Sequence, residues 1–166
     1  MRLIEVHGNY GSRKWAMVDP EDHEWLSSKK WFLSSHGYAY TVLRKVKAAG
    51  KSTQQNVPMH RVVALANSDQ HTDHINGDKL DNRKSNLRLC TNRENAMNAR
   101  RRPLNTSGYK GVGWDKAKGL WRAYIKVNYR QIWLGYYRDR ESAALAYNEA
   151  ARLHFGDFAR LNSVKP

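Results

Sequence analysis

The sequence predicts an α+β protein, and three observations lead to this expectation. Apolar and polar residues alternate over 121–127, which is the period of a half-buried strand. Asp19 and Asp139 each precede a stretch of helix-forming residues, as N-cap residues do. Asn76-Gly77 is a turn signal between two short strand-like stretches. Four parts are expected in chain order: a mixed α/β piece (1–58), a strand–loop–strand–helix core (59–98), a basic linker (99–106) and a three-stranded antiparallel sheet packed on one helix (107–166).

The N-terminal part carries its own strand and helix signals. Asp19 is expected to cap a helix that has Pro20 at its first position and includes Trp25 and Leu26. A turn is expected at 34–37, where Ser and Gly cluster. Strands are expected at 15–18, 31–33 and 38–43, a basic hairpin tip at 45–51, and a short apolar helix at 59–66.

The charge of the chain favours a nucleic-acid partner. Lys and Arg total 29 against 15 Asp and Glu, for a formal net charge of +14. Such an excess attracts phosphate backbones, although it also occurs on proteins that are merely basic at the surface. Arg100, Arg101 and Arg102 stand together in the linker, where they either face solvent or follow a DNA backbone.

Cysteine content and hydropathy exclude several classes of protein. Cys90 is the one cysteine, so a disulfide framework or a cysteine-based zinc site within one chain is excluded. No apolar stretch approaches the roughly 18 residues of a membrane-spanning helix, and the N-terminus lacks the apolar segment of a signal peptide. We therefore expect an intracellular protein without membrane contact.

A polar motif near the middle of the chain has the composition of a metal-assisted hydrolase. Asp73 and His74 are adjacent, and Asn86 and Asn95 follow at intervals of 12 and 9 residues. A neutral imidazole can take a proton from water near pH 7. Carboxylate and carboxamide oxygens suit a hard cation such as Mg²⁺ or Mn²⁺. The alternative is that the Asp-His pair and the turns around it are structural.

Residues 60–98 resemble the HNH endonucleases, in particular the homing endonucleases of phages. The resemblance implies a ββα-metal nuclease core that residues 1–58 support. It assigns His74 as general base, Asp73 and Asn95 as metal ligands, and Asn86 as the asparagine that positions the loop. The matching segments are Met59-His60-Arg61-Val62-Val63, Asp73-His74-Ile75-Asn76-Gly77-Asp78, Leu80-Asp81-Asn82-Arg83, Ser85-Asn86-Leu87-Arg88 and Thr91-Asn92-Arg93-Glu94-Asn95.

The C-terminal part has two sheet faces of different character. Trp121, Ala123, Ile125 and Val127 share one face, and the next strand is expected to alternate Ile132, Leu134 and Tyr136 with Gln131, Trp133 and Tyr137. A helix from Asp139 to Gly156 is expected to pack through Ala143, Tyr147, Ala150 and His154. The opposite face then presents basic and aromatic groups suited to duplex DNA, or else to solvent. These groups are Arg122, Tyr124, Lys126, Gln131 and Trp133.

This part resembles the DNA-binding domain named for Apetala-two and ethylene response factors. The matching segments are Ser107-Gly108-Tyr109-Lys110-Gly111-Val112, Trp121-Arg122-Ala123, Trp133-Leu134-Gly135-Tyr136-Tyr137 and Ala143-Ala144-Leu145-Ala146-Tyr147-Asn148. Members of that family lay the sheet into the major groove, and Lys110 and Trp133 match contacting positions. Gly113 replaces a base-contacting Arg and Tyr124 replaces a Glu, so the docking mode carries over better than any base preference.

Together these features predict a site-directed endonuclease of the homing type that acts on double-stranded DNA. One nuclease segment per chain favours a monomer that nicks one strand, with a dimer as the way to cut both. If the protein is phage-encoded, its place is the cytoplasm of a bacterial host. The rival interpretation is a DNA-binding regulator with an inactive HNH segment, and a structured-RNA binder is a third.

Overall fold

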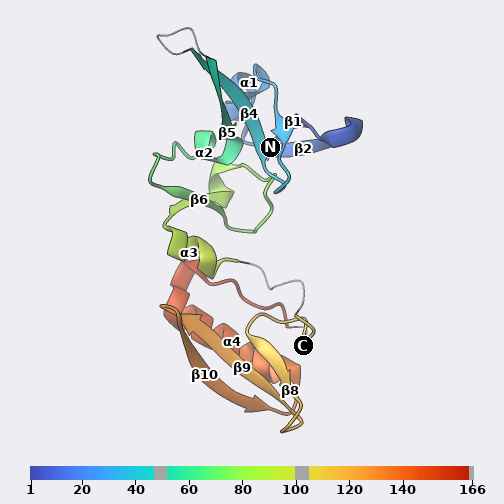
Figure 1. Ribbon diagram of the computed structural model, residues 1–166, viewed down its shortest axis with the longest axis vertical. Coiled ribbons are helices and arrows are strands. Elements are labelled where there is room, and N and C mark those ends of the chain that lie inside the picture. Colours follow the sequence, from blue (N-terminus) through green and yellow to red (C-terminus); the bar gives the residue numbers. More distant parts are fainter. Residues whose placement is uncertain (47–51, 100–104, 165–166) are drawn as a thin grey trace. The chain divides into compact units, whose positions relative to one another are not determined.

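The computed structural model describes residues 1–46, 52–99 and 105–164 (Figure 1). The chain forms two compact units, Met1–Asn92 (unit 1) and Arg93–Pro166 (unit 2). Helices and three separate sheets confirm the α+β class. The finer division into four parts stays a prediction. Among the described residues, no helix is long and apolar enough to cross a membrane.

Unit 1 is built on a five-stranded sheet in the order β2-β1-β3-β4-β5. Neighbouring strands are antiparallel, except that β1 and β3 pair in parallel at His7 and Phe32. The strands are β1 (Arg2–His7), β2 (Arg13–Val18), β3 (Phe32–Leu33), β4 (Ala39–Val46) and β5 (Ser52–Pro58). A short 3₁₀ turn, η1 (Asn9–Gly11), joins β1 to β2.

Two helices accompany this sheet, α1 (Pro20–Ser27) and α2 (Met59–Val63). Leu26 and Met59 are fully buried in one apolar core with strand residues such as Val6 and Val18. The helix at 59–66 is shorter than predicted, because Leu65 adopts a positive φ of 50° just after it.

Most predicted elements of this unit are confirmed, and two strands were missed. β1 carries charged residues, and β5 is almost wholly polar, so neither shows a strand pattern. The basic tip predicted at 45–51 lies largely outside the described residues.

The middle of the chain forms a hairpin followed by a helix. β6 (His71–His74) pairs antiparallel with β7 (Leu87–Cys90), and the 3₁₀ turn η2 (Lys84–Asn86) leads into β7. The helix α3 (Asn92–Met97) begins where the sequence predicts. Asn92 closes unit 1 and the rest of α3 belongs to unit 2.

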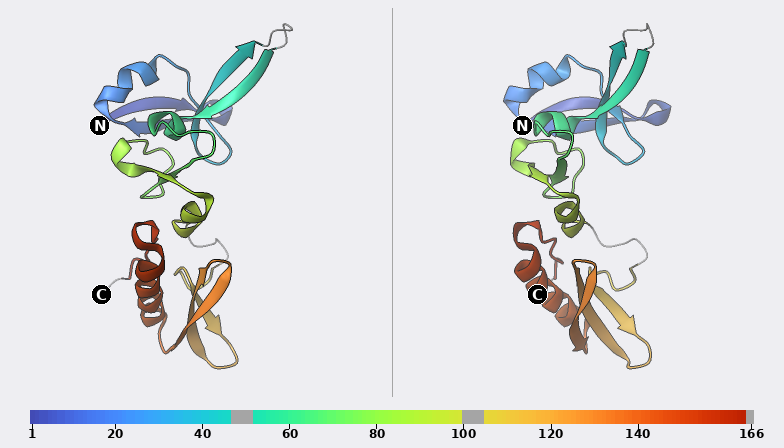
Figure 2. Two further views of the ribbon diagram at one scale, coloured as in Figure 1. Left: turned by 90° about the vertical axis from the view of Figure 1, so that its left-hand side faces the viewer. Right: turned by 60° about the vertical axis from the view of Figure 1, so that its left-hand side comes forward.

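Unit 2 is a three-stranded antiparallel sheet, ordered β10-β9-β8, with the long helix α4 along one face (Figure 2). Its elements are β8 (Val112–Asp115), β9 (Leu120–Val127), β10 (Arg130–Tyr137), α4 (Arg140–Phe155) and the 3₁₀ turn η3 (Gly156–Phe158). The alternation predicted in β9 is confirmed, since Ala123 and Ile125 are buried against the helix side. Asp139 caps α4 as expected: its side chain accepts from the Ser142 amide at 2.6 Å.

Two expectations about the packing of unit 2 are wrong. A β-bulge between Trp133 and Gly135 shifts the register of β10. Beyond this bulge Tyr136 meets Trp133 edge-on, with ring centroids 4.6 Å apart, while Tyr137 packs into the core. The bulge therefore exchanges the faces predicted for the two tyrosines.

On α4 the predicted core residue His154 is exposed, and its neighbour Phe155 is buried instead. The last turns bury Asn148, the predicted Ala150, and the three residues Tyr147, Ala151 and Phe155. These three recur every four residues, which is the spacing of one face of a helix.

Candidate active site

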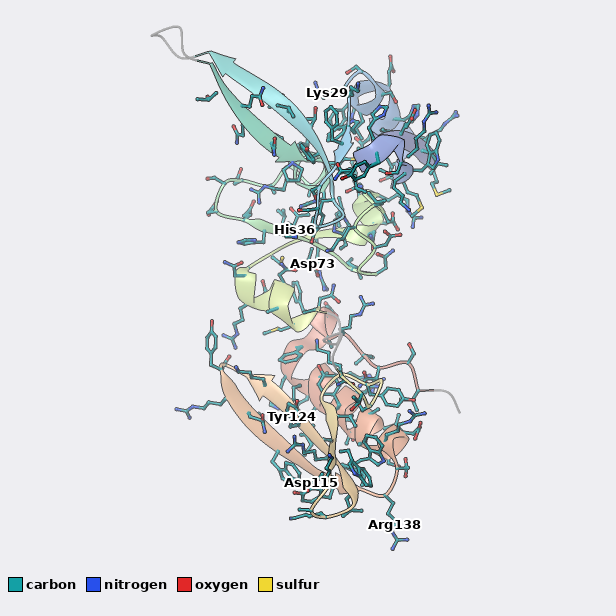
Figure 3. All side chains as sticks on the ribbon, turned by 45° about the vertical axis from the view of Figure 1, so that its right-hand side comes forward. Lys29, His36, Asp73, Asp115, Tyr124 and Arg138 are labelled. Atoms are coloured by element: carbon teal, nitrogen blue, oxygen red, sulfur yellow. The ribbon has the colours of Figure 1, made fainter. Side chains whose placement is uncertain are left out.

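Asp73 and His74 lie at the end of β6, where the hairpin gives way to a loop. Asp73 is labelled in Figure 3. Both residues are buried, with 6% and 4% exposure. The chain reverses directly after them: the Gly77 amide donates to the His74 carbonyl oxygen at 2.8 Å, and Gly77 has a φ of 72°. Two consecutive residues at a strand end thus supply a buried carboxylate and a buried imidazole.

The loop after His74 is braced by the carboxamide of Asn86. Its Oδ1 accepts from the Asn76 amide at 3.0 Å, and its Nδ2 donates to the Asp81 carbonyl oxygen at 2.8 Å. The Asp81 carboxylate accepts from Asn76 Nδ2 at 2.9 Å and forms an ion pair with Arg83 at 2.7 Å. Arg83 holds the pKa of Asp81 below its usual value. Asn86 therefore acts on the shape of the loop.

This loop is fastened to the sheet of unit 1. The Met17 amide donates to the Leu80 carbonyl oxygen, and the Asn82 amide donates to the Met17 carbonyl oxygen, each at 2.8 Å. The Lys84 amide donates to the Asp19 carboxylate at 2.7 Å. Asp19 was expected to cap α1, and its side chain makes no capping bond there. The edge strand β2 thus fixes the loop that follows His74.

Three side chains surround the His74 ring. His60 on α2 meets it edge-on, with ring centroids 5.1 Å apart, and Tyr38 lies 5.9 Å from it. On the polar side, His74 Nε2 is 3.3 Å from Asn82 Oδ1. Sequence reasoning missed Tyr38 and Asn82 as site residues, because nothing in an isolated sequence indicates that a polar side chain is buried.

Burial shifts the protonation equilibria of this cluster. It lowers the pKa of His60 to about 3, with the neighbouring His74 and Arg61 as further causes. Burial also lowers the pKa of His74, against an opposing effect of Asn82 and nearby aspartates. The pKa of Tyr38 is raised by burial and by Asp73. Both imidazoles are accordingly neutral at physiological pH, as a general base must be before it takes a proton.

Asp73 forms an ion pair across the hairpin with Arg88, its register partner in β7. Arg88 Nη2 and Nε lie 2.7 and 3.0 Å from Asp73 Oδ2. The guanidinium of Arg88 shows that a positively charged group can pair with this buried carboxylate. Oxygen donors of this kind fit a hard divalent cation.

A second acidic group in unit 1 serves a different purpose. Asp19, Glu21 and Asp22 form the one group of three His, Cys, Asp or Glu side chains close enough to share an ion within the described part of the chain. Lys84 Nζ already lies 3.0 Å from Asp22 and 3.5 Å from Glu21. This cluster therefore neutralises a lysine and anchors the loop.

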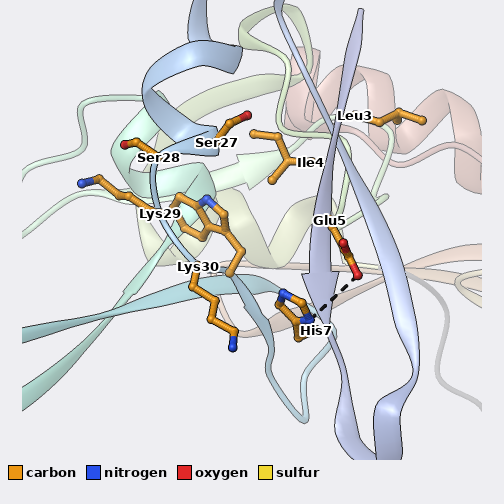
Figure 4. A pocket seen from close by; sticks show the side chains of 9 residues that line it. Leu3, Ile4, Glu5, His7, Ser27, Ser28, Lys29 and Lys30 are labelled. Carbon is orange, nitrogen blue, oxygen red and sulfur yellow. Dashed lines mark ion pairs between the residues drawn. The ribbon is translucent and has the colours of Figure 1, made fainter.

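A pocket of about 460 Å³ opens between β1 and the end of α1 (Figure 4). His7 Nδ1 lies 3.9 Å from Glu5 Oε1 at its wall, and Lys29 and Lys30 line it too. Its lining includes neither Asp73 nor His74. The candidate catalytic side chains thus belong to a strand end and not to this pocket.

The remaining predicted site residues lie in unit 2 or in the linker. Asn95 lies on α3, and its pairing with Asp73 as a metal ligand stays a prediction. Arg100, Arg101 and Arg102 lie outside the described residues.

The outer face of the three-stranded sheet carries the expected set of basic and aromatic side chains, with Tyr124 labelled in Figure 3. Trp133 is 48% exposed and lies beside Tyr136. Tyr136 also donates to Asp115 at 2.9 Å, which the sequence did not indicate. The exposed members among the predicted contacts are Arg122, Lys126, Gln131 and Trp133.

Lys110 departs from this arrangement. Its ammonium donates to the Met97 carbonyl oxygen at 2.6 Å, within unit 2. Burial, together with the charge of Arg160, lowers its pKa to about 8. Its DNA contact stays a prediction, whereas the hydrogen bond to the end of α3 is part of the fold.

Comparison with known proteins shows which family the chain resembles. The family model described as HNH endonuclease matches residues 57–97, which contain β6, β7 and α3. Protein 3.8 of Escherichia phage T7 is 37% identical over 93 residues, 54% of this chain and 74% of that protein. An uncharacterized HNH endonuclease of Acanthamoeba polyphaga mimivirus is 29% identical over 160 residues, 93% of this chain and 78% of that protein.

A third relative covers a smaller share. A dehydration-responsive element-binding protein (2D) of Arabidopsis thaliana is 37% identical over 84 residues, 49% of this chain and 40% of that protein. No solved structure matches significantly.

The chain is an HNH endonuclease, a DNA-cleaving enzyme, and it belongs to one family with Protein 3.8 of Escherichia phage T7.

Proposed function

We propose that the protein is a site-directed homing-type endonuclease that nicks one strand of double-stranded DNA. The observation that carries this proposal is the buried, neutral His74 beside a carboxylate that already pairs with a cationic group. His74 takes a proton from water, the hydroxide oxygen bonds to phosphorus, and the leaving oxygen departs as its bond to phosphorus breaks. Asn86 keeps the loop beside His74 in shape through its two hydrogen bonds.

Asp73 and Asn95 would hold one divalent cation, Mg²⁺ or Mn²⁺. Such an ion, when bound, polarises the phosphate and stabilises the departing oxygen. Arg88 must then give up part of its contact with Asp73 Oδ2. One nuclease segment in each chain favours a monomer with one cleavage centre.

The outer face of the unit 2 sheet is the proposed docking surface for duplex DNA. Arg122 and Lys126 would contact phosphates, while Tyr124 and Trp133 would contact bases or sugars. Gln131 is placed to hydrogen-bond a base edge or a phosphate. Support comes from the exposure of Arg122, Lys126, Gln131 and Trp133 and from the partial likeness to a plant element-binding protein. The basic linker and Lys110 are weaker candidates for the same duplex.

Cleavage of supercoiled DNA that carries the gene's own flanking sequence tests the nuclease part. Nicked circles should form with Mg²⁺ and disappear with a chelator or with His74→Ala. His36→Ala is the matched control, because this exposed histidine lies on another loop of unit 1. Linear product from a single encounter would contradict the nicking mode. DNA binding without cleavage under any cation would instead favour the DNA-binding regulator.

A salt titration tests the docking surface separately. The double variant Arg122→Ala with Lys126→Ala should bind duplex DNA more weakly and lower the slope of log K against log salt by about 2, because each lost phosphate contact removes roughly 0.9. Arg152→Ala, an exposed arginine on α4, is the control. Equal slopes for all three proteins would exclude this face as the docking surface.

A further inference from the structure

Asn82 is buried next to His74 and is held rigidly from several directions. The residue is 1% exposed. Its backbone amide donates to the Met17 carbonyl oxygen at 2.8 Å, which ties it to the edge strand β2. Its Nδ2 donates to the Leu80 carbonyl oxygen at 3.2 Å. Asn82 therefore presents one defined atom to the His74 ring, with the five-stranded sheet as its support.

The hydrogen-bond donors and acceptors decide which atom that is. A backbone carbonyl oxygen can only accept, so the atom of Asn82 that faces Leu80 must be the NH₂ group. Oδ1 is then the atom that lies 3.3 Å from His74 Nε2. A carboxamide oxygen also only accepts. His74 must accordingly donate from Nε2, and the neutral ring keeps its lone pair on Nδ1.

The neighbouring rings hold the His74 imidazole in its orientation. His60 meets His74 edge-on at 5.1 Å, and Tyr38 lies 5.9 Å away on the same cluster. His60 and Tyr38 also contact each other at 5.0 Å, so the two rings form one wall. Rotation of the imidazole would require this buried wall to move.

We propose that Asn82 is a positioning residue that fixes His74 in the Nε2-protonated tautomer and makes Nδ1 the atom that takes the proton from water. This inference rests on the proposed role of His74 as general base. Nδ1 accepts the proton as the water oxygen bonds to phosphorus, and the leaving oxygen departs as its bond to phosphorus breaks. The resulting imidazolium keeps its Nε2 proton on Asn82 Oδ1, whose partial negative charge stabilises it.

Nitrogen NMR of the full-length, metal-free protein with ¹⁵N-labelled histidine tests the tautomer directly. The signals of His74 are assigned by their loss in His74→Gln. Wild-type protein should show the Nε2-protonated pattern, and Asn82→Asp, which keeps an acceptor, should preserve it. Asn82→Leu should show a mixture of the Nε2-protonated and Nδ1-protonated tautomers. An Nδ1-protonated ring in wild type, or an unchanged tautomer in Asn82→Leu, would overturn the inference.

Nicking rates separate positioning from mere support of the fold. Asn82→Leu should lower the rate at saturating DNA by about tenfold or more with little change in KM, as loss of an orienting partner does. Asn82→Asp should recover much of that rate, and the exposed Asn67→Leu should behave as wild type. Equal rates for Asn82→Leu and wild type would refute the positioning role.

The two proposals fail in different ways. Undiminished cleavage by His74→Ala would overturn the general-base assignment and the catalytic part of this inference together. A wrong tautomer in the NMR spectrum would overturn this inference and leave His74 as the base.

Discussion

Unit 1 and unit 2 hold their functional side chains by different kinds of interaction. The loop that follows His74 is held by hydrogen bonds that join distant segments, such as Asn82 with Met17 and Lys84 with Asp19. Unit 2 presents its outer sheet face by packing alanines and Tyr147 of α4 beneath the other face. Rigidity at the nuclease site thus depends on a few directional bonds, whereas rigidity at the sheet depends on shape. Five predictions test that contrast, and the largest expected effect comes first.

A substitution at Gly111 should disrupt the close packing of unit 2 most severely. An added Cβ there would meet the Tyr147 ring, lie 2.6 Å from the Tyr124 carbonyl oxygen, and sit at a φ of +75°. We expect Gly111→Ala to lower the free energy of unfolding by about 3 kcal/mol or more. Gly119→Ala, at a φ of +64° with nothing within 4 Å, should cost only about 1 kcal/mol. Urea unfolding measures both, and equal losses would assign the effect to backbone strain alone.

A substitution at Asp81 should disrupt the hydrogen-bond network of unit 1. This fully buried carboxylate joins Arg83 and Asn76, and its backbone oxygen accepts from Asn86. Asp81→Ala should cost about 2–3 kcal/mol, because it leaves polar partners unsatisfied. The exposed Asp78→Ala, in the same loop, should cost much less. A thermal unfolding series with equal shifts for both variants would contradict the network.

The same carboxylate gives unit 1 a dependence on acid. Its folded-state pKa lies below the ordinary value of 3.8, so its stabilising contribution is fully present above that pH and is lost as the pH falls through the folded pKa. Wild type should therefore lose stability in this acid range more steeply than Asp81→Ala does.

Unit 2 should show a dependence of the same sign at alkaline pH. Burial lowers the pKa of Lys110 from 10.5 to about 8, so between these values the unfolded chain binds more protons than the folded one. The unfolding free energy should rise over this interval by about 1–2 kcal/mol after allowance for partial solvent screening. Lys110→Met should abolish the rise. A parallel pH profile for the two proteins would show that the ammonium is not desolvated.

The smallest effects compare two aspartates that occupy the same position before a helix. Asp139 bonds to Ser142 in its own helix, whereas Asp19 bonds to the Lys84 amide. Asp139→Ala should cost unit 2 about 1 kcal/mol, as loss of an N-cap does. Asp19→Ala should instead accelerate hydrogen exchange at Lys84. Exchange at Lys84 that is unchanged would contradict the anchoring role of Asp19.

These contrasts explain what the sequence could predict. The sheet of unit 2, its turn at Asn128-Tyr129 and its capped helix follow from local patterns, which carry over directly into structure. The bulge at Gly135 is also local, but a shift of one residue leaves no mark in an alternating pattern.

Around the candidate site, the residue types were evident and their partners were not. Asp73, His74 and Asn86 stand in a recognisable motif, and the loop between His74 and Asn86 was predicted. Asn82 and Tyr38 reach His74 only through the tertiary fold. A polar residue in a loop reads as solvent-facing in sequence, so its burial became apparent only in the structure.

The anchoring of the loop also orders events during folding. The bond between the Lys84 amide and Asp19 spans 65 residues, and such long-range closure is entropically costly until the intervening sheet has formed. We expect pulse-labelling during refolding to protect the amides of β1 and β2 before those of residues 80–86. During synthesis, the loop that follows His74 would then reach its native conformation only after the sheet that anchors it is complete.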